Sequence, residues 1–380
     1  MNTGAESTIR NGRSGLSRED TGSDNPSDLG SIPSESSQLD ARTALLMREF
    51  ECRWPLTEWT RKTVLVGVSG GSDSMALLEL ILRHAEDFDR VKVLHCNHGL
   101  RGDESDQDEA FVIDTCLERG IECLSVRIDP SELSSSSEET LRRIRFKHYV
   151  EAAMAFDARW IALGHHRDDN LETFFLRLFR GSGPRGLSGI PLRRSVPTTD
   201  GRPLEIIRPM LSISKSELEA WLADQGIPFR EDSSNRLGIY QRNRLRNELL
   251  PILDSLYGQG WRKHVLQVID SMTNQTQSSE LEANRILAEH WNRALPTKDI
   301  SLPLSIFQQA DWNVTREIVL AIWHTQHWSL RPWTRKHWQR LQQFFAVASQ
   351  TPHPKRIELP GKIVAKVRKG VITFEQTTDA

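Results

Sequence analysis

Short apolar runs alternate with longer amphipathic stretches through the first half of the chain. The apolar run at 64–68 predicts a buried strand that leads into a turn and a helix over 75–82. The same pattern then predicts strands at 91–96, 121–128 and 160–164 and helices at 104–119, 138–156 and 168–180. Strict alternation of strands and helices indicates an α/β fold, in which a parallel sheet carries helices on both faces. Ligands of such sheets bind beyond the carboxyl ends of the strands.

The pattern changes at both ends of the chain. Residues 1–40 are rich in Ser, Gly, Asp and Asn and hold few large apolar side chains, which predicts a disordered tail. The α/β pattern occupies 41–235 and ends with a helix at 217–225 that opens on a capping-box spacing. Residues 236–380 predict a mostly helical region with a short β-rich end. Its expected elements are helices at 240–254 and 260–290 and short strands within 356–374.

The turn after the first strand is rich in glycines and hydroxyls. It consists of Ser69, Gly70, Gly71, Ser72, Asp73 and Ser74. The first amides of a helix and the bare amides of glycine bind anions, so a phosphate site is predicted here. No Gly-Lys-Ser/Thr follows, so the turn is not a Walker loop. Asp73 would repel phosphate unless a divalent cation lies between them, which predicts Mg²⁺; the alternatives are a helix-start carboxylate and an ordinary strand–turn–helix.

A second polar motif follows the strand at 160–164. It contains two histidines and two carboxylates, and His165 and Asp169 share a helix face if the helix begins near His165. The group could hold Mg²⁺ or steer a reacting phosphate, whereas a histidine-only zinc site lacks a third ligand. N-terminal capping of the helix by Asp168 is the alternative role.

Three basic segments complete the candidate chemistry. On the helix at 138–156, Arg142 and Arg145 are three residues apart and form a fork for phosphate or carboxylate. The other two segments carry Arg180 and Arg185 beside glycines, and Arg242, Arg244 and Arg246 interleaved with asparagines. The last pattern suits an RNA backbone. A solvated basic helix face is the alternative for the two helical segments.

Composition narrows the class of protein. The charged fraction is 26%, the hydrophobic fraction is 38% and the net charge is -2, so any nucleic-acid surface must come from local clustering. No apolar run approaches the roughly 20 residues of a membrane helix, and no signal-peptide pattern opens the chain. The four cysteines form no CxxC pair, which suits a reducing cytoplasm and predicts neither a zinc nor an iron–sulfur cage.

These motifs, in this order, resemble those of the tRNA(Ile)-lysidine synthetases, within the superfamily of PP-loop ATP pyrophosphatases. The loop at 69–74 identifies only the superfamily. The paired-histidine, double-aspartate motif at 165–173 and the Arg-Gly-Ser-Gly segment at 180–183 identify the family. The other matching pieces are 97–101, 142–146, 243–246 and Leu250-Pro251. The resemblance covers roughly 60–255; Phe146 stands where the family often has tyrosine, and the tail at 1–40 is extra.

The resemblance implies a PP-loop ATP-binding catalytic domain over 41–235 and a tRNA-binding region over 236–380. ATP would adenylate the 2-oxo group of the wobble cytidine of tRNA(Ile) with a CAU anticodon. The ε-amine of free L-lysine would then displace AMP to form lysidine, which changes decoding from AUG to AUA. A cytoplasmic location is expected, and a homodimer is allowed.

The resemblance also assigns roles to residues at matching positions. Asp73 and Asp169 would hold Mg²⁺ or orient the adenylate, and His165 and Arg142 would contact the reacting phosphate. The base that deprotonates lysine has no assignment. The expected contacts to tRNA are Arg180, Arg185, Arg242, Arg244 and Arg246.

Two other functions compete with this one. A PP-loop tRNA thiolase would need a CxxC pair or a persulfide-carrying cysteine, and neither spacing occurs. An ATP-binding module without turnover would not need the histidine–aspartate motif. Seven of the eleven tryptophans lie at or beyond Trp261; core packing is their favoured use and stacking on tRNA bases the alternative.

Overall fold

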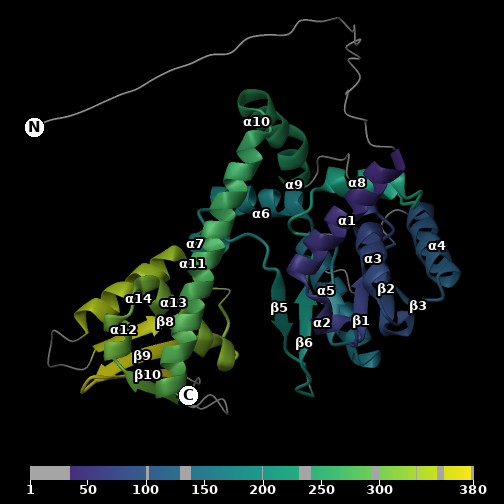
Figure 1. Ribbon diagram of the computed structural model, residues 1–380. Coiled ribbons are helices and arrows are strands. Elements are labelled where there is room, and N and C mark those ends of the chain that lie inside the picture. The colour runs from purple at the N-terminus through teal and green to yellow at the C-terminus, as the bar shows by residue number, and fades with distance from the viewer. Residues whose placement is uncertain are drawn as a thin grey trace, which may run out of the picture.

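Two lobes joined by one long helix make up the computed structural model (Figure 1). The structure describes residues 35–99, 102–128, 138–198, 200–230, 241–291, 299–330, 332–348 and 355–377. The predicted tail lies outside the described residues as far as residue 34. Helix α1 (Glu35–Arg53) begins at Glu35, so residues 35–40 are helical rather than part of a disordered tail. The reason is that Leu46 and Phe50, one helical turn apart, are buried in the core and anchor a helix that extends toward the N-terminus.

A six-stranded sheet forms the N-terminal lobe, in the order β3-β2-β1-β4-β6-β5. Strands β1 (Val64–Gly67), β2 (Val91–Asn97), β3 (Glu122–Arg127) and β4 (Trp160–Ala162) were all expected. Strand β6 (Leu204–Ile207) continues the parallel sheet, and β5 (Arg193–Val196) pairs with it antiparallel at the edge. The α/β class with a mostly parallel sheet is therefore confirmed, with two short strands that the apolar pattern did not predict.

Helices cover both faces of this sheet. Val64 and Val66 of β1 pack in one cluster with α1, α3 and α8, whereas Leu65 packs on the opposite face with α5. All three side chains are buried, as expected for a parallel strand between two helical layers. The helices are α2 (Leu56–Trp59), α3 (Ser72–His84), α4 (Asp103–Glu118), α5 (Glu138–Ala155), α6 (Arg167–Phe179), α7 (Pro184–Leu187), α8 (Lys215–Asp224) and the 3-10 turn η1 (Phe88–Arg90).

The direction of strand order reverses between β1 and β4. Successive strands are added on the β2 side first and then on the β4 side, so β1 and β4 border the switch point of the sheet. The loop at 69–74 follows β1 and the paired-histidine motif follows β4, which brings the two motifs to one place. Gly164 permits the contact, because a Cβ there would lie 2.9 Å from the backbone oxygen of Asp73.

A small cluster attaches the next segment to α6. This segment comprises α9 (Gln241–Arg244), the π-helical turn η4 (Leu245–Leu249) and α10 (Leu250–Tyr257). Leu171 of α6 packs with Leu245 and Leu250 and with Trp261 at the start of α11 (Gly260–His290). The expected boundary at 235/236 lies outside the described residues, since 231–240 are not described.

A four-stranded antiparallel sheet and three helices build the C-terminal lobe. The strand order is β7-β10-β9-β8. The strands around Pro360 were expected and β7 was not. Helix α11 has 31 residues, about 46 Å at 1.5 Å per residue, and runs from the N-terminal lobe to this sheet (Figure 1). The elements are β7 (Asp299–Pro303), α12 (Ser305–Gln309), α13 (Trp312–Thr325), α14 (Arg335–Val347), β8 (Lys355–Leu359), β9 (Ile363–Arg368) and β10 (Val371–Gln376).

The tryptophans of this lobe pack in its core. Trp323 is fully buried, and the rings of Trp328 and Trp333 meet it edge-on at 5.0 and 5.3 Å between centroids. Trp312 and Trp338 pack against the same cluster. Core packing, the favoured use of these rings, is therefore observed. Throughout the described part of the chain, every helix is too short or too polar to cross a bilayer.

Candidate active site

The loop after β1 is held in shape by its own backbone and hydroxyls. The amide of Ser69 donates to Oγ of Ser74 at 3.1 Å, and that hydroxyl donates to the carbonyl of Gly71 at 3.0 Å. Gly70 has a φ of +88°, which glycine adopts without strain. Gly71 is the N-cap of α3 and brings no side chain, so no cap oxygen competes for the first amides of the helix. These features preserve a ready-made anion site.

All three serine hydroxyls in this loop have a hydrogen-bond partner, since Oγ of Ser69 lies 3.2 Å from Oγ of Ser74. Ser74 holds the turn, and Ser72 donates to Glu219 of α8 at 3.2 Å. Both are buried, whereas Ser69 is exposed. Ser69 is therefore the hydroxyl of this loop that a ligand can reach most readily.

Asp73 lies in the first turn of α3 between two cations. Its Oδ2 is 3.5 Å from Nε2 of His166 and 3.7 Å from Nζ of Lys215. Burial acts to raise the pKa of Asp73, but the hydrogen bond and charge of His166 and the charges of Lys215 and Arg246 prevail, so the pKa is lowered. Asp73 is a carboxylate anion at neutral pH.

His166 is the N-cap of α6, not Asp168. Its Nδ1 accepts from the amide of Asp168 at 3.2 Å, and its own amide donates to Oδ2 of Asp169 at 3.1 Å, which completes a reciprocal capping box. The expected capping by Asp168 is therefore wrong, and the helix begins at Arg167 rather than His165. The reason is that an imidazole nitrogen reaches the second amide as well as a carboxylate does.

The capping geometry directs the proton of His166 toward both candidate metal ligands. Because Nδ1 accepts a hydrogen bond, the neutral ring carries its proton on Nε2, which lies 3.5 Å from Asp73 and 3.6 Å from Asp169. Burial acts to lower the pKa of His166, but the hydrogen bond and charge of Asp73 with the charges of Asp169 and Asp168 raise it. The loop at 69–74 and the motif at 165–173 therefore meet at this ring.

His165 has the opposite electrostatic environment from its neighbour. Burial, together with the charges of Arg208, Arg242 and Arg142, lowers its pKa to about 3 although Asp169 opposes them. The ring is neutral at physiological pH. Its Nδ1 is buried and has no hydrogen-bond partner among the residues that the structure describes. His165 is thus a neutral polar group available to a ligand.

Asp169 is surrounded by cations. Burial acts to raise the pKa of its carboxyl, but the charges of His166, His165 and Arg242 and the backbone hydrogen bond from His166 lower it. Arg242 Nη2 and Arg246 Nη2 lie 3.7 and 3.8 Å from its Oδ1. Asp169 therefore stays ionised within a compact group of opposite charges.

Glu172 brings two of the predicted tRNA-binding arginines into this group. Its side chain is 0% exposed and accepts from Nε of Arg242 at 2.8 Å and Nε of Arg246 at 2.6 Å. A buried carboxylate between two guanidinium groups stabilises both charges only if the pairing stays intact. In this structure Arg242 and Arg246 line the candidate active site.

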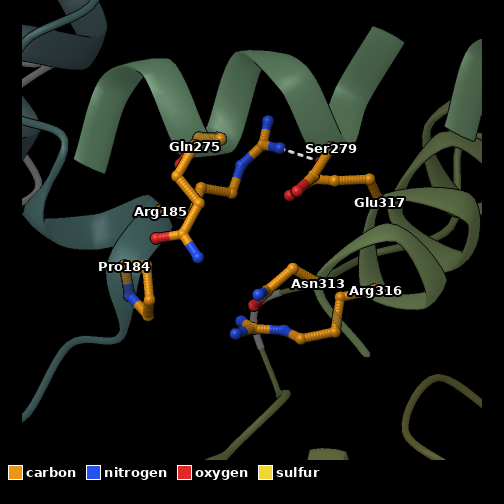
Figure 2. A pocket seen from close by; sticks show the side chains of 8 residues that line it. Pro184, Arg185, Gln275, Ser279, Asn313, Arg316 and Glu317 are labelled. Atoms are coloured by element: carbon orange, nitrogen blue, oxygen red, sulfur yellow. Dashed lines mark hydrogen bonds and ion pairs between the residues drawn. The ribbon is translucent and has the colours of Figure 1, made fainter. Parts of the chain in front are cut away.

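The remaining three arginines lie farther out. Arg180 is exposed and donates to Gln241 at 3.2 Å, and Arg244 is exposed and pairs with Glu248 at 3.0 Å. Arg185 pairs with Glu317 of α13. Figure 2 shows this pair in a pocket where α7, α11 and α13 meet. Arg185 therefore connects the two lobes.

Arg142 lies on α5, which covers the face of the sheet opposite to α3. Its charge lowers the pKa values of His165, Arg177 and Arg208, which places it on the side of the sheet end where the motifs meet. The segment at 97–101, one of the pieces that carry the family resemblance, begins where β2 ends. Just before it, Nδ1 of His95 lies 2.9 Å from the carbonyl oxygen of Val68 and ties β2 to the end of β1. Residues 100–101 of that motif lie outside the described residues.

Four residues near the site were not among the sequence-based candidates. His166 and Glu172 lie inside the quoted motif at 165–173, and their burial distinguishes them from its other members. Lys215 begins α8, whose start the capping box at 214–217 already marked. Arg208 follows β6, a strand that the apolar pattern missed, so no signal pointed to it.

Asp73 and Asp169 fit a metal ion that takes its remaining ligands from water and from the substrate. Among the residues described, no group of three or more His, Cys, Asp or Glu side chains forms a ready metal cage. Mg²⁺ commonly uses one or two carboxylates and takes its other ligands from water and phosphate oxygens. Asp73 and Asp169, which converge on one ring nitrogen from two elements, fit that requirement.

Comparison with known proteins agrees with this arrangement. A family model described as a PP-loop domain matches residues 46–253. The tRNA(Ile)-lysidine synthase of Rhodopirellula baltica is 32% identical over 339 residues, which cover 78% of this chain and 83% of that protein. The enzyme of the same name from Bacillus cereus is 36% identical over 265 residues, or 67% of this chain. That alignment spans about half, 53%, of the Bacillus protein's length.

The fold also resembles that of a solved structure. The U34-tRNA thiolase NcsA from Methanococcus maripaludis superposes with a TM-score of 0.50 at 16% identity, covering 62% of this chain and 80% of that chain. At this level of identity the likeness concerns the fold alone.

Proposed function

The chain belongs to the tRNA(Ile)-lysidine synthase family, and from that premise we propose that it ligates free L-lysine to tRNA(Ile) bearing a CAU anticodon. ATP would adenylate the 2-oxo group of the wobble cytidine, and the ε-amine of lysine would displace AMP to form lysidine. The observation that carries the proposal is the meeting of the loop at 69–74 with Asp169 at the ring of His166.

The loop after β1 would hold the diphosphate end of ATP, the nucleotide that PP-loop enzymes use. Bare amides at Gly70 and Gly71 and the positive end of α3 favour phosphate oxygens. Lys215 Nζ, 3.7 Å from Asp73, adds a positive charge beside the same turn. Because this turn is preorganised, it stabilises the charge that builds as pyrophosphate leaves.

Asp73 and Asp169 would hold Mg²⁺. Bound there, the ion would neutralise charge on the phosphate oxygens. Nε2 of His166 lies 3.5 Å from Asp73 and 3.6 Å from Asp169, so its ring would keep the two carboxylates close together. The lowered pKa values of both carboxyls keep them ionised, which cation binding requires.

His165 and Arg142 would act on the phosphate that is attacked. Neutral His165 can offer a hydrogen bond without carrying a charge, and Arg142 supplies a fixed positive charge. Attack by lysine then needs a neutral amine, whose ordinary pKa is about 10.4. The lowered pKa values of His165 and Asp169 make both of them weak bases, so we assign the deprotonation to neither.

The exposed arginines and the C-terminal lobe would bind the tRNA. Arg180 and Arg244 are exposed on neighbouring elements, since Arg180 bonds Gln241 of α9, and suit phosphodiester contacts. Arg185, paired with Glu317, would set the position of the second lobe. We propose a cytoplasmic location, because tRNA and ATP are available there; a homodimer stays a prediction.

The cysteine at the carboxyl end of β2 does not suit the thiolase alternative. Cys96 lies on β2 near the sheet end, and burial raises the pKa of its thiol to about 11 although Arg145 opposes the shift. Such a thiol is protonated and a poor nucleophile. Replacing all four cysteines is expected to leave turnover intact; loss of activity on replacing one of them would favour the thiolase.

The decisive experiment incubates the full chain with ATP, Mg²⁺, radiolabelled lysine and total tRNA. Label is expected in a single tRNA with a CAU anticodon, with one pyrophosphate released per lysine incorporated. Omission of ATP and replacement of lysine by arginine are the controls. Pyrophosphate release without label in tRNA would reject the ligase in favour of another PP-loop activity.

A further inference from the structure

Arg208 is a buried cation that the proposed reaction does not yet use. It directly follows β6, at the carboxyl end of the sheet, and is 3% exposed. Its amide donates to the carbonyl of Leu192 at 3.0 Å, and its Nη1 donates to the carbonyl of Pro191 at 2.8 Å. The side chain is thus held in one position by the chain that leads into β5.

The charge of Arg208 has no counter-charge in the described part of the chain. Among the described residues no carboxylate lies within 4 Å of it, and its Nε is buried without a hydrogen-bond partner. Burial, with the charges of Arg142 and Arg194, lowers its pKa to about 10, so the group stays protonated at neutral pH. Burying an unpaired charge is costly, and a site of this kind needs an explanation.

His165 lies beside Arg208, and it too has a buried nitrogen without a hydrogen-bond partner among the described residues. Strands β4 and β6 are neighbours, and the amide of Leu163 donates to the carbonyl of Ile207 at 3.0 Å. The residues that follow these strands therefore lie close together, and the charge of Arg208 contributes to the lowered pKa of His165. The buried nitrogen of His165 is Nδ1. Two unsatisfied polar atoms and one uncompensated charge thus gather at one end of the sheet.

The position of Arg208 in the sheet indicates that it binds an anion other than the diphosphate of ATP. Strand β4 separates β6 from β1, so two strand spacings of about 4.8 Å place Arg208 roughly 10 Å from the loop at 69–74 along the sheet edge. Because only 3% of Arg208 is exposed, the end of a small molecule reaches its guanidinium more readily than a bulky polymer backbone does. The free amino acid of the proposed reaction carries one such group, an α-carboxylate, and a guanidinium edge is its preferred partner in proteins.

We propose that Arg208, with His165 beside it, forms the subsite for the α-carboxylate of the lysine substrate. This assignment rests on the proposed function and deepens it. The buried charge would select a free amino acid over a simple amine and position the ε-amine by anchoring the opposite end of the molecule. Arg208 is then a specificity-determining residue, and it plays no part in forming the adenylate.

The test compares lysine with cadaverine, which has the same amine and chain length but no carboxylate. The wild-type protein is expected to prefer lysine in kcat/KM. In Arg208→Gln this preference should fall by about 10- to 100-fold, the size expected when one charged hydrogen-bonded contact is lost. The fall should arise from a higher KM for lysine, with cadaverine nearly unaffected. Pyrophosphate release from ATP and tRNA without amine should remain.

Two further variants control the result. Arg193→Gln removes an exposed arginine of β5 that pairs with Glu58, and should leave the preference unchanged. Arg208→Lys keeps the charge with fewer donors and should recover part of the preference. Circular dichroism and thermal unfolding establish that each variant is folded; should Arg208→Gln not fold, Arg208→Lys carries the comparison.

The outcomes separate this inference from the function on which it rests. If the wild type incorporates no lysine into tRNA, the proposed function fails. If it does, and Arg208→Gln slows lysine and cadaverine equally, Arg208 is structural and the subsite is wrong. A higher KM for tRNA at unchanged KM for lysine would assign the same oxyanion contact to a tRNA phosphate and would also overturn the proposal.

Discussion

The two lobes bury very different side chains. At the carboxyl end of the N-terminal sheet, His166, Glu172 and Arg208 are all nearly inaccessible, and each is polar or charged. The C-terminal lobe buries Trp323 and Phe374 in a large apolar cluster, and it buries few polar side chains, among them Thr315 and Glu317. Apolar packing stabilises a lobe without demanding partners, whereas a buried charge is costly unless a protein group or a ligand compensates it. The contrast supports the proposal that the N-terminal lobe carries the chemistry.

The largest expected effect comes from the charge group itself. Asp169→Asn keeps the shape of the side chain but removes a charge that faces His166, Arg242 and Arg246. Lysine-dependent pyrophosphate release should fall by at least about 1,000-fold, because a catalytic ion contact is lost. A folded variant, by circular dichroism, with near-normal turnover would contradict the site assignment.

Glu172→Gln tests how much stability the protein loses when a buried ion pair is left incomplete. The change leaves Arg242 and Arg246 beside each other without the carboxylate that receives both. The free energy of unfolding should drop by about 3 kcal/mol, measured by urea denaturation. Glu248→Gln, which breaks the exposed pair with Arg244, is the matched control and should cost less than about 1 kcal/mol. Equal effects would mean that burial is not what matters at Glu172.

Trp323→Ala should damage only the C-terminal lobe. The ring is fully buried against Trp328, Trp333 and Phe374, so its removal should cost that lobe about 3 kcal/mol or somewhat more. Binding of ATP should persist while binding of tRNA weakens, measured by calorimetry and filter binding. Loss of ATP binding in a protein whose N-terminal lobe stays folded would show that the lobes do not divide the work in this way.

The smallest effect concerns a carboxylate away from the site. Hydrogen bonds from Ser125 and Asn97, and the Arg127 guanidinium, lower the pKa of Glu109 to about 2 although burial opposes them. A lowered folded-state pKa stabilises the protein above the ordinary value of 4.5, and this contribution is lost as pH falls toward 2. Glu109→Gln should therefore show a shallower fall in Tm between pH 5 and 3 than the wild type. Parallel curves would reject the pairing.

The sequence alone predicted the fold class and the two main motifs. The apolar runs of β1 to β4 and the helices between them are long enough to stand out, and the long helix α11 has the expected bounds. Strand β5 was missed because it opens on two exposed arginines, and β6 was missed because Glu205 interrupts its short apolar run. The helix start at Arg167 was missed because capping by a histidine is uncommon and depends on its rotamer.

What the sequence determined by itself is local: where strands give way to helices, which turn carries glycines and hydroxyls, and which family those motifs resemble. The tertiary structure decided which charges meet. Arg242 and Arg244 are two positions apart, yet one reaches the buried Glu172 and the other an exposed Glu248. Arg208 acquired its buried, unpaired state from a strand that the pattern did not reveal. Pairing and burial depend on segments distant along the chain, and spacing within one segment carries no information about them.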